Sequence, residues 1–201
     1  MDLSCGLPPG PDVAAHVRVA EDLGYRRAWI FDSPALYGDI WVQLALCAEA
    51  TESIGLGTAV LVPSLRHPMV NAAAIAQIDQ LAPGRLAVAI GTGFTGRFVL
   101  GQQPMKWADV ERYVRQLQAL LAGGTVEIDG AECRMIHPVG EVSARPIDVP
   151  IVVAANGPKG LATAERLGAA GVMSIFGPQP GWKWSSLFGY GTVLDPGESR
   201  L

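Results

Sequence analysis

Residues that could bind a ligand stand directly after apolar runs of strand length. Gly91-Thr92-Gly93 follows the run Leu86–Ile90, and Asn156-Gly157-Pro158-Lys159-Gly160 follows the run Pro150–Ala155. Glycines allow a backbone to lie flat against a planar ring or a phosphate. Amides at the start of a helix, together with one lysine, favour an anion. The two segments therefore predict contacts with a ligand, the second of them with a phosphate.

Two titratable side chains occupy comparable positions and are candidate proton carriers. Asp32 follows the apolar run Arg27–Phe31, and His67 lies in an Arg-His pair between two prolines. Asp32 can be read either as a site carboxylate or as the N-cap of the next turn. The three histidines of the chain are scattered without i, i+4 pairing, so the sequence indicates no metal site.

The bulk properties describe one domain covering residues 1–201. Hydrophobic residues make up 49% of the chain and charged residues 17%, which is typical of an α/β protein with a covered sheet. A net charge of -4 without a Lys/Arg cluster argues against a nucleic-acid partner. No apolar run approaches the roughly 20 residues of a membrane span, and no signal peptide is evident. Three widely spaced cysteines suggest reduced thiols, so we expect a soluble, cytoplasmic protein.

The alternation of apolar runs with helical stretches predicts parallel strands buried on both faces. The expected strands are Leu3–Leu7, Arg27–Phe31, Leu56–Val62, Leu86–Ile90, Pro150–Ala155 and Val172–Phe176. The expected helices are one capped by Asp12, then Ile40–Glu52, Met69–Leu81, Trp107–Leu121 and Leu161–Ala170. Residues 125–148 break this rhythm and predict an inserted hairpin and excursion, with strand-like pieces at Val126–Ile128 and Cys133–Ile136. The tail from Gly177 is not assigned.

The fold class is therefore α/β, with about six βα units. A (β/α)8 barrel of the TIM type needs eight units and roughly 250 residues, so the chain is either an incomplete barrel or a smaller doubly wound sheet. Gly91–Gly96 also matches the dinucleotide pattern G-x-G-x-x-G, although Gly101 and Pro104 argue against the long helix that this fingerprint requires. A strand order of 3-2-1-4 would favour the dinucleotide fold, and a closing curved sheet would exclude it.

Seven short segments carry a family resemblance that covers residues 1 to 195 in order. They are Ala20–Tyr25, Asp32–Trp41, Ala50–Val60, Arg66–Pro68, Pro83–Arg85, Gly91–Gly93 and Asn156–Lys159. In order and spacing the chain resembles the luciferase-like monooxygenase superfamily, in particular bacterial proteins similar to methylene-tetrahydromethanopterin reductase.

The resemblance implies a (β/α)8 barrel that binds FMN or the 8-hydroxy-5-deazaflavin coenzyme at the carboxyl ends of its strands. It places a bulge, often with a non-prolyl cis peptide, at Ala59–Val60 behind the coenzyme ring. It lays Gly91, Thr92 and Gly93 along the coenzyme and assigns the phosphate to the turn of Ala155, Asn156, Gly157, Pro158 and Lys159. Deazaflavin-dependent relatives often carry His and Glu where this chain has Ser33 and Phe94.

The leading hypothesis is a flavin- or deazaflavin-dependent oxidoreductase that transfers hydride between the coenzyme and a small organic substrate. The alternatives are an NAD(P)-dependent dehydrogenase of the Rossmann type and a non-catalytic barrel fragment or partner subunit. An unfinished parallel sheet would leave two bare edges. We therefore also expect self-association, for example as a homodimer.

Overall fold

Seven parallel strands form one curved sheet in the computed structural model, which describes residues 2–189. The strands follow one another in chain order, and each pairs with the next. They are β1 (Ser4–Leu7), β2 (Arg27–Ile30), β3 (Gly55–Leu61), β4 (Leu86–Ile90), β7 (Ile151–Ala154), β8 (Gly171–Ser174) and β9 (Trp184–Leu187). This order is that of an incomplete TIM-type barrel, because β1 lies at one edge of the sheet rather than at its centre. The Rossmann alternative is therefore wrong.

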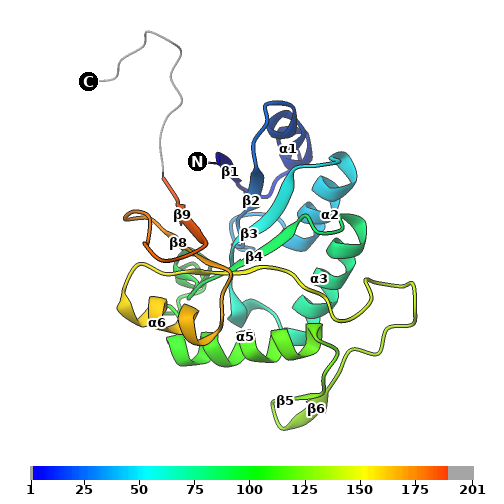
Figure 1. The fold of residues 1–201 in the computed structure, drawn as a ribbon, viewed down its shortest axis with the longest axis vertical. Helices are drawn as coiled ribbons and strands as arrows, with labels where there is room; N and C mark the ends of the chain where they lie inside the picture. The colour runs from blue at the N-terminus through cyan, green and yellow to red at the C-terminus, as the bar shows by residue number, and fades with distance from the viewer. Residues whose placement is uncertain (1, 190–201) are drawn as a thin grey trace.

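Five helices pack around the outer side of this sheet (Figure 1). They are α1 (Val13–Asp22), α2 (Ile40–Ala50), α3 (Pro68–Leu81), α5 (Trp107–Leu121) and α6 (Pro158–Arg166). The apolar stripe of α5 explains its position, since Val110, Val114 and Leu117 are fully buried in the main hydrophobic core. Two shorter helices, η1 (Pro63–Leu65) and α4 (Phe94–Phe98), lie in the connections after β3 and β4.

A second, smaller cluster fills the inner side of the curved sheet. Gly57 on β3 leaves room for the Trp29 indole of β2, since a Cβ there would lie 2.5 Å from the ring, and Ala87 and Ala89 on β4 belong to the same cluster. The Arg27 guanidinium lies 5.4 Å from the Trp29 ring centroid and 5.5 Å from that of Trp184 on β9. The ring of Phe188, just past β9, meets Phe31 edge-on at 6.0 Å between centroids. The two ends of the sheet thus approach each other through side chains.

The strand β9 is the main difference from the sequence-based expectation, which left this region unassigned. It lies beside β8 after a connection that contains no helix among the described residues. A Cβ on Gly171 would lie 2.2 Å from the Cβ of Trp184, so a glycine is required for this close pairing. The rest of the tail, residues 190–201, lies outside the described residues.

The six expected strands and five long helices are confirmed, with smaller corrections. Asp12 precedes α1, but its side chain makes no capping bond with the described residues, whereas Asp39 caps α2 by accepting from Trp41 and Val42. Helix α6 begins at Pro158 rather than Leu161, so its first turn includes Lys159.

The inserted hairpin is also confirmed, as β5 (Val126–Ile128) and β6 (Ala131–Cys133). It projects past α5 (Figure 1). The second strand was expected at Cys133–Ile136, but β6 already ends at Cys133. It begins earlier because the turn at Asp129 and Gly130, both with positive φ, is tight. The remainder of the excursion runs along α3, where Ser143 N–H donates to the Ala76 carbonyl.

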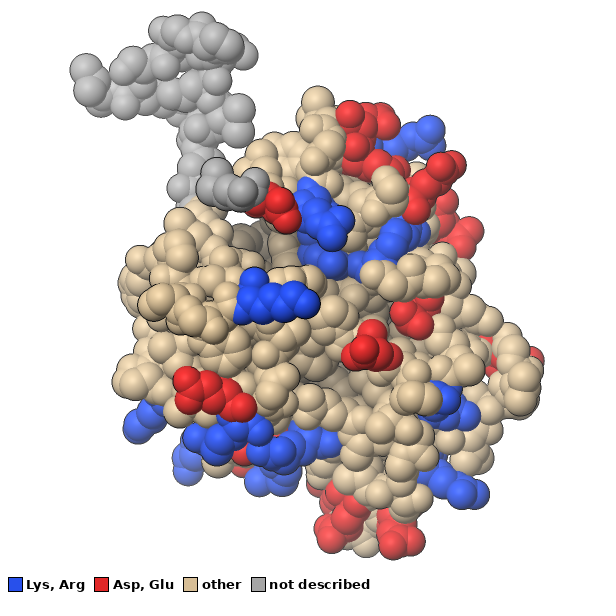
Figure 2. All heavy atoms as spheres, viewed as in Figure 1, with Lys and Arg blue, Asp and Glu red and all other residues tan. Residues whose placement is uncertain are grey.

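No helix in the described part of the chain is long and apolar enough to cross a membrane. Cys5, Cys47 and Cys133 are free thiols, and burial raises the pKa of Cys47 to about 12. Acidic and basic side chains are interspersed on the face displayed in Figure 2.

Glu21 joins the end of α1 to the start of β3 and gives the fold a pH-dependent contact. Its carboxylate accepts from the amides of Glu52, Ser53 and Ile54 at 2.6 to 3.2 Å. Burial acts to raise its pKa, but these donors and the Ser53 hydroxyl prevail and lower it to about 2, against an ordinary value of 4.5.

We predict that Glu21→Gln destabilises the protein at pH 7 and that its deficit shrinks as the pH falls from 4.5 towards 2. A carboxyl group whose folded-state pKa is depressed stabilises the fold above its ordinary pKa, and this contribution is lost on protonation. Urea denaturation of both proteins at several pH values measures the difference. A deficit that stays constant down to pH 2 would contradict the assignment, and Glu132→Gln, on the exposed hairpin, is the control.

Candidate active site

The end of β3 carries the irregularity that the family resemblance implied. The peptide bond between Ala59 and Val60 is cis, and the pairing of β3 with β4 shifts register between Thr58 and Leu61. Ala59 and Val60 remain half-buried and pack against the inner cluster. The expected bulge is therefore confirmed, and it leaves a small backbone platform on the inner side of the sheet.

The loop after β4 lies directly against this platform. A Cβ on Gly91 would come within 2.9 Å of the Val60 side chain and 3.4 Å of Ala154 Cβ. Gly93 has a φ of 80°, and a Cβ there would lie 2.4 Å from Val62. Glycine is therefore required at both positions by the protein's own packing. The ends of β3, β4 and β7 meet at this point.

Two hydrogen bonds tie the turn after β7 to the end of β8 and the residue that follows it. The Asn156 side chain accepts from the Ile175 amide at 3.0 Å, and the buried Ala155 donates its amide to the Met173 carbonyl at 2.9 Å. Gly157 is the N-cap of α6, so no side chain caps the helix at this position. Pro158 is the first residue of the helix, and the following Lys159 is exposed. The start of a nine-residue helix with an adjacent lysine favours an anion.

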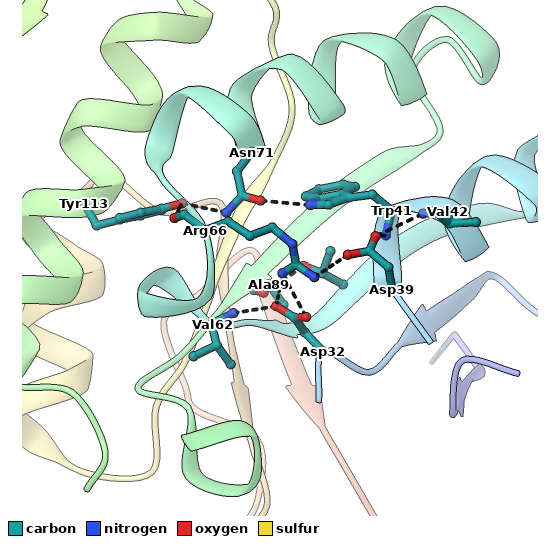
Figure 3. Close-up of polar contacts among 10 residues, drawn as sticks. Asp32, Asp39, Trp41, Val42, Val62, Arg66, Asn71, Ala89 and Tyr113 are labelled. Carbon is teal, nitrogen blue, oxygen red and sulfur yellow. Dashed lines mark hydrogen bonds and ion pairs between the residues drawn. The ribbon is translucent and has the colours of Figure 1, made fainter. Parts of the chain in front are cut away.

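Asp32 is buried in an ion pair rather than open to a ligand (Figure 3). Both of its oxygens lie 2.9 Å from Arg66 Nη1, and one also accepts from the Val62 amide at 3.1 Å. Arg66 Nη2 donates to Asp39 at 2.8 Å. Burial raises the pKa of Asp32 against the opposing effect of Arg66. Burial would lower the pKa of Arg66, but Asp32 and Asp39 prevail and raise it.

His67 is exposed and caps α3. Its Nδ1 accepts from the Met69 amide at 3.1 Å, which assigns the ring proton of the neutral imidazole to Nε2. Its role as a proton carrier stays a prediction, as does that of Asp32. Asp32 would first have to leave Arg66, whereas His67 is accessible as it stands.

A chain of buried hydrogen bonds fixes the loop that bears His67, and the sequence reasoning did not find it (Figure 3). Trp41 Nε1 donates to Asn71 Oδ1 at 2.8 Å, and Asn71 Nδ2 donates to the Tyr113 hydroxyl at 2.6 Å. The Tyr113 hydroxyl donates to the Arg66 carbonyl at 3.0 Å, and burial raises its pKa to about 12. The available signal was Asn71 within an Ala-rich apolar helix, where an amide needs partners.

We predict that Arg66→Met costs about 3 to 5 kcal/mol of unfolding free energy, because it leaves Asp32 buried without its countercharge. Arg66→Met/Asp32→Asn should recover part of this loss. Arg26→Met is the control, since its ion pair with Asp2 is 4.0 Å long and exposed and is worth under about 1 kcal/mol. Chemical denaturation of the four proteins provides the measurement. Equal losses in Arg66→Met and Arg26→Met would show that the buried pair does not support this end of the sheet.

Comparisons with known proteins agree with this geometry. The family model described as luciferase-like monooxygenase matches residues 4–182. An F420-dependent glucose-6-phosphate dehydrogenase of Beutenbergia cavernae is 35% identical over an alignment of 179 positions, which covers 78% of this chain and 50% of that protein. The 5,10-methylenetetrahydromethanopterin reductase of Methanopyrus kandleri is 32% identical over an alignment of 196 positions, which covers 86% of this chain and 55% of the relative.

Solved structures lead to the same conclusion. The coenzyme F420-dependent tetrahydromethanopterin reductase of Methanopyrus kandleri superimposes with a TM-score of 0.70 at 27% identity, covering 86% of this chain and 55% of that one. The chain thus spans about half the length of the relatives it matches. It belongs to the luciferase-like monooxygenase family.

Proposed function

We propose that the protein is a flavin- or deazaflavin-dependent oxidoreductase that transfers hydride between its coenzyme and a small organic substrate. The observation that carries the proposal is the bulge of β3 at Ala59 and Val60, against which the Gly91–Gly93 loop is packed. A platform of this kind suits a flat ring. The proteins similar to this chain include F420-dependent enzymes, which supports the same class of coenzyme.

The residues present fit such a coenzyme at two places. Ala59 and Val60 would support its ring from behind, with Gly91, Thr92 and Gly93 along its side. The turn of Ala155, Asn156, Gly157, Pro158 and Lys159 would receive its phosphate, with Lys159 as the nearby cation. When bound, FMN or the deazaflavin supplies the hydride chemistry, and the protein supplies orientation and a site from which water is excluded.

The proton that accompanies hydride transfer requires a titratable group near the substrate. Related deazaflavin enzymes often have His and Glu where this chain has Ser33 and Phe94. Neither of these side chains has a group that titrates near neutral pH. We assign this role to the exposed His67. Asp32 then acts through Arg66 as a positioning residue for the loop that bears His67.

The proposal includes self-association of the chain. In the described residues, β1 and β9 are the edges of the sheet, and each pairs on one side only. An unpaired parallel edge favours contact with a second copy. Sedimentation velocity should therefore show a dimer or larger species, and a stable monomer over the concentration range would oppose this part of the proposal.

We predict that the protein binds FMN or the deazaflavin coenzyme and that Lys159→Ala weakens this binding by about 1 to 2 kcal/mol. Loss of one charge-assisted hydrogen bond to a phosphate has this magnitude. Parallel titrations with both coenzymes, followed by absorbance of the washed protein, provide the measurement. Lys183→Ala is the control, because Lys183 precedes β9 and so lies at the amino ends of the strands. Absence of binding by either coenzyme would refute the proposed function.

A further inference from the structure

Arg27 places a positive charge on the inner side of the sheet. Successive side chains of a strand point to opposite faces. Ala28 and Ile30 join the main core, so Arg27 shares the inner face with Trp29. The neighbouring strand begins with Gly55, where a Cβ would lie 2.8 Å from the guanidinium carbon. The guanidinium therefore lies half-buried across the start of β3.

This charge lies at the amino end of the sheet. Arg27 is the first residue of β2, and Trp184, which it also contacts, is the first residue of β9. All seven strands of the described sheet are parallel, and the Gly91–Gly93 loop follows the carboxyl end of β4. Arg27 is therefore separated from the segments assigned to the coenzyme by the length of the strands.

One edge of the guanidinium is without a partner among the described residues. Nη1 of Arg27 donates to the carbonyls of Leu56 and Arg85, which engages both of its hydrogens. Nε and Nη2 make no hydrogen bond within the described chain, and neither is buried away from solvent. We call these two nitrogens the Arg27 fork. Their parallel N–H bonds match the two oxygens of a carboxylate.

The charged groups nearest to the fork are basic. Burial and the adjacent charge of Arg26 lower the pKa of Arg27 to about 10, and no carboxylate acts in the opposite direction. Arg66 differs, because Asp32 and Asp39 raise its pKa. The exposed Lys183, next to Trp184, adds a further positive charge at this end. An anion at the fork would offset the unfavourable burial of the guanidinium.

The carboxylates at this end of the sheet do not supply that anion. No carboxylate among the described residues lies within 4.0 Å of Arg27. Asp2 lies 4.0 Å from Arg26, and Glu52 lines an open cleft beside the ends of α2 and α3. In the segments that precede the seven strands (residues 2–3, 23–26, 51–54, 82–85, 134–150, 167–170 and 175–183), the carboxylates are Asp2, Glu52, Glu141 and Asp148.

Two indole rings restrict the shape of an anion at the fork. The ring centroids of Trp29 and Trp184 lie 5.4 and 5.5 Å from the guanidinium carbon. A carboxylate paired with both nitrogens continues the plane of the guanidinium, whereas a phosphate is tetrahedral and thicker. Trp184 is only half-buried, so part of its ring is available to the organic part of a ligand.

We propose that the Arg27 fork binds a small, planar organic carboxylate, which accepts from Nε and Nη2 and lies against Trp184. The site is independent of the proposed function, because it lies at the opposite end of the sheet from the coenzyme segments.

The test is an NMR titration of the full chain with benzoate at constant ionic strength, which follows the indole N–H signals. The signals of Trp29 and Trp184 should shift and saturate, whereas Trp41 and Trp107, whose helices begin at the carboxyl end of the sheet, should not shift. Each signal is assigned with a Trp→Phe variant. Inorganic phosphate should bind at least about tenfold more weakly than benzoate, because its shape does not match the flanked fork.

Variants of the two adjacent arginines separate the fork from general positive charge. Arg27→Lys keeps the charge but loses the paired donors, so the benzoate Kd should rise about tenfold. Arg27→Met should abolish the saturable shift. Arg26→Met, at the exposed neighbour, is the control and should change the Kd less than about threefold. The same spectra report folding, and Arg27→Lys decides the question if Arg27→Met does not fold.

Several results would overturn the inference. Absence of any shift in the wild type, or equal losses in Arg26→Met and Arg27→Lys, would refute the fork. Phosphate that binds as tightly as benzoate would refute the carboxylate class. A shift of Trp107 alone, which packs on Gly160, would place benzoate at the coenzyme turn. Tighter binding by Asp195→Asn/Glu198→Gln, at positions outside the described residues, would show that the chain's own carboxylates occupy the fork. None of these results bears on the proposed function.

Discussion

The buried ion pair between Asp32 and Arg66 is the contact on which the carboxyl end of the sheet depends. It joins the end of β2 to the loop after β3, and Asp32 also accepts from the Val62 amide. Val62 in turn packs against Gly93, and the Asp32 carbonyl packs against Gly96. The segment assigned to the coenzyme and helix α4 therefore both rest on this pair. Both oxygens of the Asp32 carboxylate are thus engaged by the protein itself.

Three glycines allow the loops at this end of the sheet to lie close to their neighbours. Gly91 lies against Val60, Gly93 against Val62, and Gly160 against Trp107 and Ala155. The first two place the β4 loop on the bulge of β3. The third sets the first turn of α6 against α5, and with it Lys159. A side chain at any of them would separate segments that the proposed coenzyme would contact together, so the same residues would set the loop spacing and the proposed coenzyme binding.

The sequence predicted this framework well, since continuous apolar runs alternating with helices have few other readings. The bulge at Ala59 and Val60 came from the family resemblance, because no local pattern marks it. Strand β9 could not be predicted: Trp184-Ser185-Ser186-Leu187 has no apolar run, and its position depends on Gly171 and on the Arg27 guanidinium near Trp184. Asp32 was predicted as a candidate proton carrier, and the sequence did not indicate its ion pair, because Arg66 lies 34 positions away and pairing at that separation is decided by the fold.

The two sides of the proposed site differ in polarity. The loop after β7 leads into Lys159, whereas the loop after β4 carries an exposed pair of phenylalanines. Lys159 and the start of α6 provide one polar end, while Phe94 and Phe98 provide an apolar one. Ala59 and Val60 on the neighbouring strand β3 are half-buried. A molecule that carries a phosphate at one end and a flat ring at the other matches this gradient from polar to apolar surface. The substrate would then meet the ring on the side of the loop after β4, where Phe94 and Phe98 are exposed.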